Sequence, residues 1–135
     1  MHTSFDRILL DAPCSGEGTL RKEHALFAGA TRQTIARLSN LQKRLIVRAY
    51  DLLRPGGTLV YSTCTFAPEE NEAVVAHLLR ERDARLLPAA LPVTGHPGLD
   101  AWELERYPDV LRNARRFYPH DLDSGGGFLA QIEHP

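Results

Sequence analysis

Two short apolar runs, each followed by a segment with helical periodicity, constrain the fold of this chain more than any other feature. The first run is "RILLD" at residues 7–11 and the second is "TLVYST" at residues 58–63. Continuous apolar runs of this length are typical of parallel strands that are buried on both faces. Two units of strand and crossover helix in succession predict a parallel, right-handed α/β arrangement.

The segment between the two runs has the pattern of an amphipathic helix over about residues 34–53. One side of this helix repeats apolar residues at steps of three and four, namely Leu38, Leu41, Leu45, Ala49 and Leu52. Another side carries Arg37, Arg44 and Arg48. We interpret the basic side as a solvated face, with an RNA contact as the alternative. The sequence "RPGG" at 54–57 is expected to end the helix.

A second helix is predicted from Pro68 to about Arg82. Proline suits the first helical position, and acidic residues in the first turn suit the helix dipole. Three acids occur there, and we expect them to serve helix initiation: Glu69, Glu70 and Glu72.

The last third of the chain is predicted to contain a long irregular segment followed by two strands. Residues 88–112 are rich in proline and glycine, and we expect one helical turn near Trp102, with Trp102 and Tyr107 packing the segment. "RRFYPH" at 115–120 and "GGGFLAQIE" at 125–133 are predicted to be strands. They should pair antiparallel because no helix fits between them.

The composition is that of a soluble globular domain. Of the 135 residues, 43% are hydrophobic and 24% are charged, and the formal net charge is -1, which argues against disorder. No segment approaches the roughly 18 consecutive apolar residues of a membrane-spanning helix, and the first residues lack a signal-peptide pattern. We therefore expect one cytoplasmic domain with no membrane partner.

Both cysteines of the chain, Cys14 and Cys64, are expected to be free thiols, because a secreted disulfide scaffold would need more cysteines. A zinc site that also used His24 and His120 is disfavoured, since no two of these residues have the close spacing of a zinc motif. No metal is therefore expected.

The two cysteines mark a candidate site at one edge of the predicted sheet. Cys14 lies three residues beyond the first strand and Cys64 directly follows the second. Ligands of open α/β sheets bind beyond the carboxyl ends of the strands, so the two thiols should converge if these strands are neighbours or one apart. A helix that begins at Pro68 would be one means of lowering a thiol pKa.

Asp11 adds a carboxyl group at the same edge, and Pro13 stiffens the turn that follows it. A carboxyl group at this position can hydrogen-bond a ring nitrogen and polarise a heteroaromatic substrate. A thiol and a carboxyl group together suit conjugate addition, in which a thiolate attacks an electron-poor ring carbon.

The segments "DAPCSGEG" (11–18) and "STCTFAPEENE" (62–72), with "RRFYPH" and "GGGFLA" after them, resemble motifs of the RsmB/RsmF-type RNA cytosine-5 methyltransferases. RsmF-like enzymes of bacterial 16S ribosomal RNA are the most similar. The resemblance extends over nearly the whole chain. It implies a Rossmann-like class I methyltransferase sheet, S-adenosylmethionine as cofactor and RNA as partner, with 16S ribosomal RNA as the expected substrate.

The resemblance also implies a role for each matching residue. Cys64 matches the nucleophile that adds to carbon 6 of cytosine, and Cys14 matches the cysteine that helps to release the methylated base. Asp11 matches the aspartate that lies against cofactor and cytosine, and Pro13 matches the turn that presents them. Arg116 and His120 fall in a motif near the target pocket, and we expect them to contact the substrate.

One alternative concerns the nucleophile. Enzymes that methylate cytosine in DNA use a proline-cysteine at the position of Cys14, so position in the fold alone would favour Cys14. The threonines on either side of Cys64 favour the RNA type and Cys64.

The family's glycine-rich cofactor motif does not occur in this sequence. The resemblance thus implies that residues 1–135 correspond to the C-terminal half of a methyltransferase domain. We expect weak binding of S-adenosylmethionine and no activity from these residues alone. The strand at 7–11 or its neighbour should form a bare sheet edge that recruits a partner.

Two further interpretations remain open. The chain is a non-catalytic fragment that binds or complements a missing half, or it is a thiol-disulfide protein. The absence of a Cys-x-x-Cys motif argues against the second.

Overall fold

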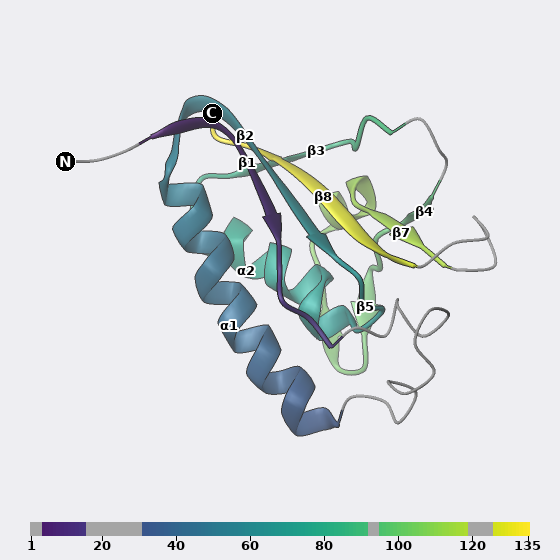
Figure 1. Ribbon diagram of the computed structural model, residues 1–135. Helices are drawn as coiled ribbons and strands as arrows, with labels where there is room; N and C mark the ends of the chain where they lie inside the picture. The colour runs from purple at the N-terminus through teal and green to yellow at the C-terminus, as the bar shows by residue number, and fades with distance from the viewer. Residues whose placement is uncertain (1–3, 16–30, 92–94, 119–125) are drawn as a thin grey trace.

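The computed structural model describes residues 4–15, 31–91, 95–118 and 126–135 (Figure 1). Two α-helices, two 3-10 helices and eight strands follow one another in these residues. Their bounds are β1 (Phe5–Asp11), α1 (Arg32–Asp51), β2 (Leu53–Thr63), η3 (Pro68–Glu70), α2 (Glu72–Glu81), β3 (Arg85–Leu87), β4 (His96–Pro97), β5 (Ala101–Trp102), β6 (Glu105–Arg106), η4 (Asp109–Asn113), β7 (Arg115–Phe117) and β8 (Gly127–Glu133).

The main sheet combines one parallel pair with antiparallel C-terminal strands. Its order is β1-β2-β8-β7-β4, and β3 also pairs with β8. Strands β1 and β2 are parallel neighbours, whereas β8 is antiparallel to β2, β3 and β7. These pairings confirm the predicted parallel unit and the predicted antiparallel pair at the C-terminus.

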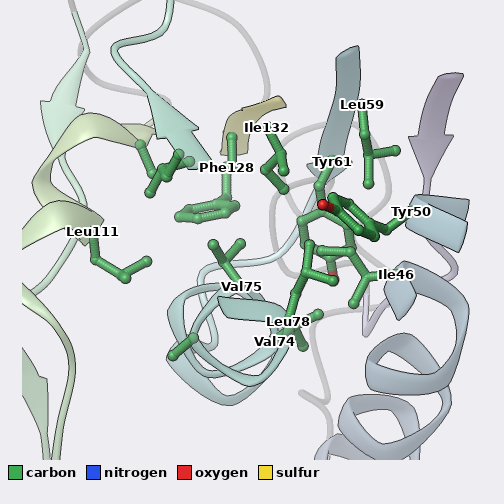
Figure 2. Packing of buried hydrophobic residues seen from close by; sticks show 14 of the residues in the cluster. Ile46, Tyr50, Leu59, Tyr61, Val74, Val75, Leu78, Leu111, Phe128 and Ile132 are labelled. Carbon is green, nitrogen blue, oxygen red and sulfur yellow. The ribbon is translucent and has the colours of Figure 1, made fainter. Parts of the chain in front are cut away.

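The hydrophobic core lies between the sheet and the two helices, which cover the same face of the sheet in Figure 1. Figure 2 shows Leu59 and Tyr61 of β2 facing Ile46 of α1 and Val74 and Leu78 of α2, all nearly inaccessible to solvent. Alternate residues of β2 and β8 are buried, as expected for a sheet with one covered face.

Strand β1 was predicted to be buried on both faces, and this prediction is wrong for the described part of the chain. Leu9 is 69% exposed, and β1 is the edge strand. On the face of the sheet opposite the helices, an open groove of about 680 Å³ is lined by residues that include Leu9, Val60 and Gln131. Neither described helix covers this face (Figure 1).

Helix α1 lies close to its predicted range, but its buried stripe differs from the predicted leucine stripe. The hydroxyl of Thr31 caps the helix by accepting the Thr34 N–H at 3.1 Å. The buried positions are Ser39, Gln42, Ile46, Ala49 and Tyr50, whereas the four leucines of the predicted stripe are half-buried. Ser39 and Gln42 face inward and donate hydrogen bonds to the Glu69 and Pro13 carbonyls, respectively. The predicted basic residues Arg37, Arg44 and Arg48 are exposed.

Helix α1 ends at Asp51, just before the predicted stop at 54–57. Residues 54–57 lie in the first part of β2, where the register with β1 shifts between Phe5–Leu53 and Arg7–Thr58. Gly56 in this irregularity has a φ of 85°, a value that glycine adopts without the steric penalty of other residues.

The predicted helix from Pro68 is split. Residues 68–70 form the 3-10 helix η3, and α2 begins only at Glu72. Glu69 and Glu70 lie in the first turn of η3 and Glu72 in the first turn of α2. Glu70 and Glu72 are also fully buried, which the prediction of a role in helix initiation did not include.

The segment around Trp102 forms a β-hairpin of β5 and β6 instead of a helical turn. Its reversal places Glu103 at a φ of 53°. Tyr107 is buried, as predicted, but Trp102 is 43% exposed. No helix of the described residues has the length and apolarity that crossing a membrane requires.

Candidate active site

The two cysteines meet at the carboxyl ends of β1 and β2. The strands are paired up to Asp11 and Ser62, and the Ala12 N–H extends the ladder to the Ser62 carbonyl at 3.0 Å. Beyond this point Cys14 Sγ lies 3.0 Å from Cys64 Sγ. Both thiols are free and partly exposed, so the predicted convergence is confirmed.

The sulfur of Cys14 is also an acceptor for the backbone of the other cysteine. The Cys64 N–H donates to Cys14 Sγ at 3.4 Å. The contact of the two sulfurs is therefore supported by a second hydrogen bond between the same residues.

The pKa of the Cys64 thiol is raised to about 12, chiefly by burial, and the hydrogen bond and charge of Cys14 and the charge of Asp11 contribute to this rise. The expectation that a helix at Pro68 lowers this pKa is wrong, because only the short η3 begins there. In the free protein Cys64 is therefore a thiol at neutral pH. Its use as a nucleophile requires removal of a proton during the reaction.

Asp11 and Pro13 lie next to the cysteines and are exposed. The influence of Asp11 on the Cys64 pKa reflects their proximity. Both residues are therefore accessible at the open end of the strands, and their contacts with cofactor and substrate stay predictions.

A fully buried carboxylate, Glu70, joins the two cysteine-bearing loops. Its Oε1 accepts the Ser15 N–H at 2.9 Å and the Gln42 side-chain N–H at 2.9 Å, and its Oε2 accepts the Thr65 hydroxyl at 3.4 Å. Ser15 follows Cys14 and Thr65 follows Cys64. The Ser15 and Thr65 hydroxyls also hydrogen-bond to each other at 2.7 Å.

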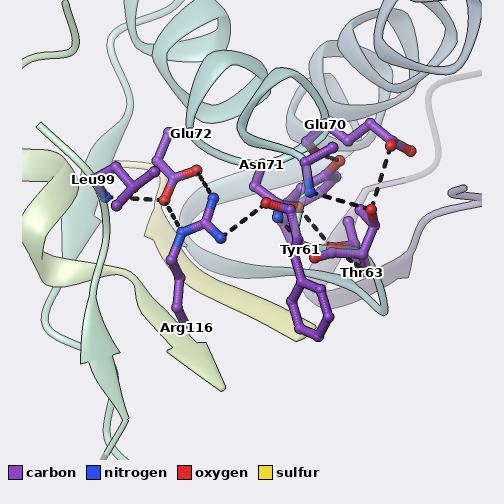
Figure 3. A network of polar contacts seen from close by, with 10 residues as sticks. Tyr61, Thr63, Glu70, Asn71, Glu72, Leu99 and Arg116 are labelled. Carbon is purple, nitrogen blue, oxygen red and sulfur yellow. Dashed lines mark hydrogen bonds and ion pairs between the residues drawn. The ribbon is translucent and has the colours of Figure 1, made fainter. Parts of the chain in front are cut away.

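The loop after Cys64 is fixed by a further set of buried hydrogen bonds (Figure 3). Thr63 donates its hydroxyl to Asn71 Oδ1 at 2.6 Å, and the Asn71 amide donates to the Thr65 carbonyl at 2.9 Å. Tyr61 donates its hydroxyl to the Glu70 carbonyl at 2.7 Å. The residues before and after Cys64 are therefore both tied to the η3–α2 segment.

Arg116 does not point to solvent, which corrects its predicted role as a direct substrate contact. Its side chain is 2% exposed and pairs with Glu72 through two hydrogen bonds (Figure 3). A third hydrogen bond goes to the Phe66 carbonyl at 3.0 Å. Burial opposes the charge of Arg116, but Glu72 and Tyr118 raise its pKa on balance. Arg116 therefore holds the Cys64 loop from inside the protein.

The other predicted substrate contact, His120, lies outside the described residues, as does His24, which was considered as a zinc ligand. Within residues 4–15, 31–91, 95–118 and 126–135, no cluster of three His, Cys, Asp or Glu side chains has the arrangement of a metal site.

A cavity of about 470 Å³ adjoins the Cys64 loop. Its walls come from the start of α1, the loop at Phe66–Pro68 and the β5–β6 hairpin, with Ile35, Phe66 and Trp102 supplying apolar surface. One residue of its wall, Phe66, lies two residues after Cys64 in the sequence.

Glu70 and Gln42 were not recognised as site residues from the sequence. One signal was present: Ser39 and Gln42 are polar residues three apart on a helix whose neighbouring positions are leucines. Such a pair on an inward face indicates buried hydrogen bonds.

Comparison with known proteins identifies the family. A family model described as 16S rRNA methyltransferase RsmB/F matches residues 1–133. The chain belongs to the RsmB/F family. This RsmB/F chain is 45% identical over 135 residues to the tRNA (cytosine(49)-C(5))-methyltransferase of Pyrococcus abyssi, covering 98% of the chain and 42% of that protein.

Other relatives include rRNA enzymes and solved structures. Ribosomal RNA small subunit methyltransferase F of Vibrio campbellii is 36% identical, with 95% of this chain and 25% of that protein covered. A crystal structure of a methyltransferase homologue from Pyrococcus horikoshii has a TM-score of 0.84 and 39% identity, with 98% of this chain and 40% of that chain covered.

The structure of NSun6 from Pyrococcus horikoshii with SFG has a TM-score of 0.81 and 33% identity, with 99% of this chain and 31% of that chain covered. The RsmB/F chain thus spans less than half the length of each of these relatives. Its sheet is part of a methyltransferase fold, as predicted.

Proposed function

We propose that this RsmB/F chain is the part of an S-adenosylmethionine-dependent RNA cytosine-5 methyltransferase domain that bears the two catalytic cysteines. Within the complete domain it would act through a covalent adduct between Cys64 and cytosine. The observation that carries the proposal is the 3.0 Å contact of Cys14 and Cys64 at an open strand end beside Asp11. The family match and the names of the relatives support the reaction type.

In this mechanism the S–H bond of Cys64 breaks and its proton passes to water, while the sulfur forms a bond to carbon 6 of the target cytosine and the electron pair of the carbon 5–carbon 6 double bond moves onto carbon 5 and the ring. Asp11 hydrogen-bonds the pyrimidine ring and stabilises the charge that develops there. S-adenosylmethionine, when bound, supplies the methyl group that carbon 5 receives. Release requires loss of the carbon 5 proton and breakage of the bond between Cys64 and carbon 6, and we assign Cys14 to this step.

Several observations support the predicted cofactor. Asp11 and Pro13 are exposed and accessible to it. The related NSun6 structure contains SFG, an analogue of S-adenosylmethionine. We propose that the remaining contacts come from sequence outside these 135 residues, and that the chain alone binds S-adenosylmethionine weakly and is inactive. Calorimetric titration that gave ordinary affinity would contradict this point.

We propose 16S ribosomal RNA as the substrate, because the family description and a relative from Vibrio campbellii name small-subunit RNA. The relative from Pyrococcus abyssi is named for tRNA, so transcripts of both kinds belong in the assay. His120 stays a predicted substrate contact, while Arg116 is assigned to positioning the Cys64 loop.

The test is covalent capture of RNA by the chain joined to, or co-expressed with, the N-terminal segment of a related enzyme. RNA that contains 5-fluorocytosine should be trapped by the wild type, and Cys64→Ser should abolish the adduct. Cys14→Ser should instead let the adduct with ordinary RNA accumulate. The opposite pattern would make Cys14 the nucleophile, as in the DNA enzymes.

A second candidate is a non-catalytic fragment that binds or complements a missing half. The exposed edge strand β1, with Leu9 69% and Phe5 46% exposed, favours association. A heterodimer that forms through this edge without restoring methyl transfer would support this candidate over the enzyme.

A further inference from the structure

We propose that Glu70, together with Gln42, is a positioning residue that sets the separation of the two thiols. This inference rests on the proposed function, because it concerns the geometry on which adduct formation and release would depend. It assigns a role to two buried side chains that do not themselves reach the substrate.

Hydrogen bonds of Glu70, Ser15 and Thr65 join the two loops that carry the cysteines. Cys14 and Cys64 are 50 residues apart in sequence, and both lie beyond the last paired residues of β1 and β2. Ser15, next to Cys14, donates its N–H to Glu70 at 2.9 Å and shares a 2.7 Å hydrogen bond with the Thr65 hydroxyl. The carboxylate thus receives a donor from each loop.

Gln42 lies between the same groups. Its side-chain nitrogen has two hydrogens, and it donates to the Pro13 carbonyl at 2.7 Å and to Glu70 Oε1 at 2.9 Å. Gln42 is fully buried on α1. Both loops are therefore held against one helix.

The described hydrogen-bond donors to the Glu70 carboxylate carry no charge. Glu70 accepts from a backbone N–H, an amide and a hydroxyl, which are all uncharged. A buried carboxylate is expensive to desolvate, and an apolar residue of similar volume is often equally stable in a protein interior. A carboxylate held by donors from both cysteine loops has a directional function that an apolar side chain cannot replace.

The distance between the two sulfurs shows how closely the loops are held. A sulfur–sulfur separation of 3.0 Å, with the Cys64 N–H also directed at Cys14, requires both loops to be held to a fraction of an ångström. If Glu70 and Gln42 provide this restraint, their loss should lower the effective concentration of one thiol near the other.

The experiment measures the equilibrium of the full 135-residue chain with glutathione, without RNA or cofactor. Two thiols and one oxidised glutathione give one Cys14–Cys64 disulfide and two reduced glutathiones, so electrons balance. For Glu70→Leu and Gln42→Leu we expect the equilibrium constant to fall about tenfold or more, where tenfold corresponds to about 1.4 kcal/mol.

Two matched controls separate positioning from general loosening. Tyr50→Phe removes the hydrogen bond from a buried α1 hydroxyl to the Asp83 carbonyl at 2.9 Å, and Ser39→Ala removes another buried α1 hydrogen bond, which goes to the Glu69 carbonyl. Both controls should keep the equilibrium constant within about twofold of the wild type, even where thermal unfolding shows lower stability.

An unchanged constant in Glu70→Leu, or an equal fall in test and control variants, would overturn the proposal. If Glu70→Leu does not fold, Gln42→Leu against Ser39→Ala carries the test, with the same two overturning results. Because the measurement needs no substrate, a chain that shows the expected thiol equilibria but never traps RNA would count against the proposed function alone.

Discussion

Glu70 and Glu72 lie two residues apart in the η3–α2 segment, and both are fully buried. They differ in their partners. Glu72 is paired with the guanidinium of Arg116 and also accepts the Leu99 N–H at 2.9 Å. Glu70 is held only by uncharged donors among its described hydrogen bonds, and these come from the two cysteine loops and α1.

Two neighbouring buried carboxylates of the η3–α2 segment, Glu70 and Glu72, therefore have different roles. Glu72 neutralises a buried cation and joins α2 to β7 and to the excursion at Leu99, so it stabilises the architecture. Glu70 joins the loops that carry Cys14 and Cys64, so it orders the candidate site. Since a buried charge without its counter-ion is far more costly than a lost neutral hydrogen bond, the two regions should respond differently to substitution.

The largest effect should follow Arg116→Met, which leaves Glu72 buried without its counter-ion. We expect a loss of about 3–5 kcal/mol in the free energy of unfolding, measured by urea denaturation. The double variant Arg116→Met with Glu72→Gln should recover much of this loss, because the orphaned charge is removed. A double variant as unstable as the sum of the single variants would contradict an ion pair as the main interaction.

The next effect should follow Glu70→Leu. Three donors lose their acceptor, but no charge is orphaned, so we expect a loss of about 2–3 kcal/mol. The same denaturation measurement checks this value. A loss greater than that of Arg116→Met would remove the distinction between the two carboxylates.

A smaller effect is expected for Tyr61→Phe. This substitution removes the hydroxyl that donates to the Glu70 carbonyl at 2.7 Å and leaves the aromatic packing intact. The expected loss is about 1 kcal/mol, which is typical of one hydrogen bond. The reaction of Cys64 with iodoacetamide should hardly change, since the Glu70 carboxylate keeps its contacts; a large change would show that the backbone contact also positions the thiols.

The last prediction concerns the pH dependence of stability that follows from the titration of Cys64. The folded protein raises its pKa to about 12, above the value of about 8.5 for an unfolded thiol. The folded state therefore holds the proton more tightly, so its contribution to stability is complete below about pH 8.5 and is lost as the pH rises toward 12.

Comparison of the wild type with Cys64→Ala across this range isolates the contribution, because Tyr61 and Tyr107, whose pKa values are also raised by burial, titrate in both proteins. Cys14→Ala should lower the Cys64 pKa by removing a hydrogen bond and a neighbouring charge, and so speed alkylation at pH 8. Slower alkylation would mean that Cys14 favours the Cys64 thiolate.

Much of the fold and part of the site could be predicted from local sequence. The runs at 7–11 and 58–63 predicted parallel strands, and the positions of Cys14 and Cys64 predicted that the thiols converge if these strands are neighbours or one apart; they are neighbours. These predictions succeed because strand direction and residue order alone decide which groups reach the carboxyl edge of a sheet.

The roles of the buried polar residues could not be predicted in the same way. Glu70 and Glu72 follow Pro68 as surface acids of a helix start would, and only the packing of α1 and β7 against this segment buries them. Arg116 stands in a motif that suggested a substrate contact, yet its partner is 44 residues away in sequence.

The order and spacing of neighbouring residues are enough to specify the alternation of strands and helices, the two cysteine motifs and the family to which they belong. The folded arrangement was needed to show that Glu70 joins the thiol loops while Glu72 neutralises Arg116. Burial and hydrogen-bond partners depend on which distant segments come into contact, and residue order does not encode that locally.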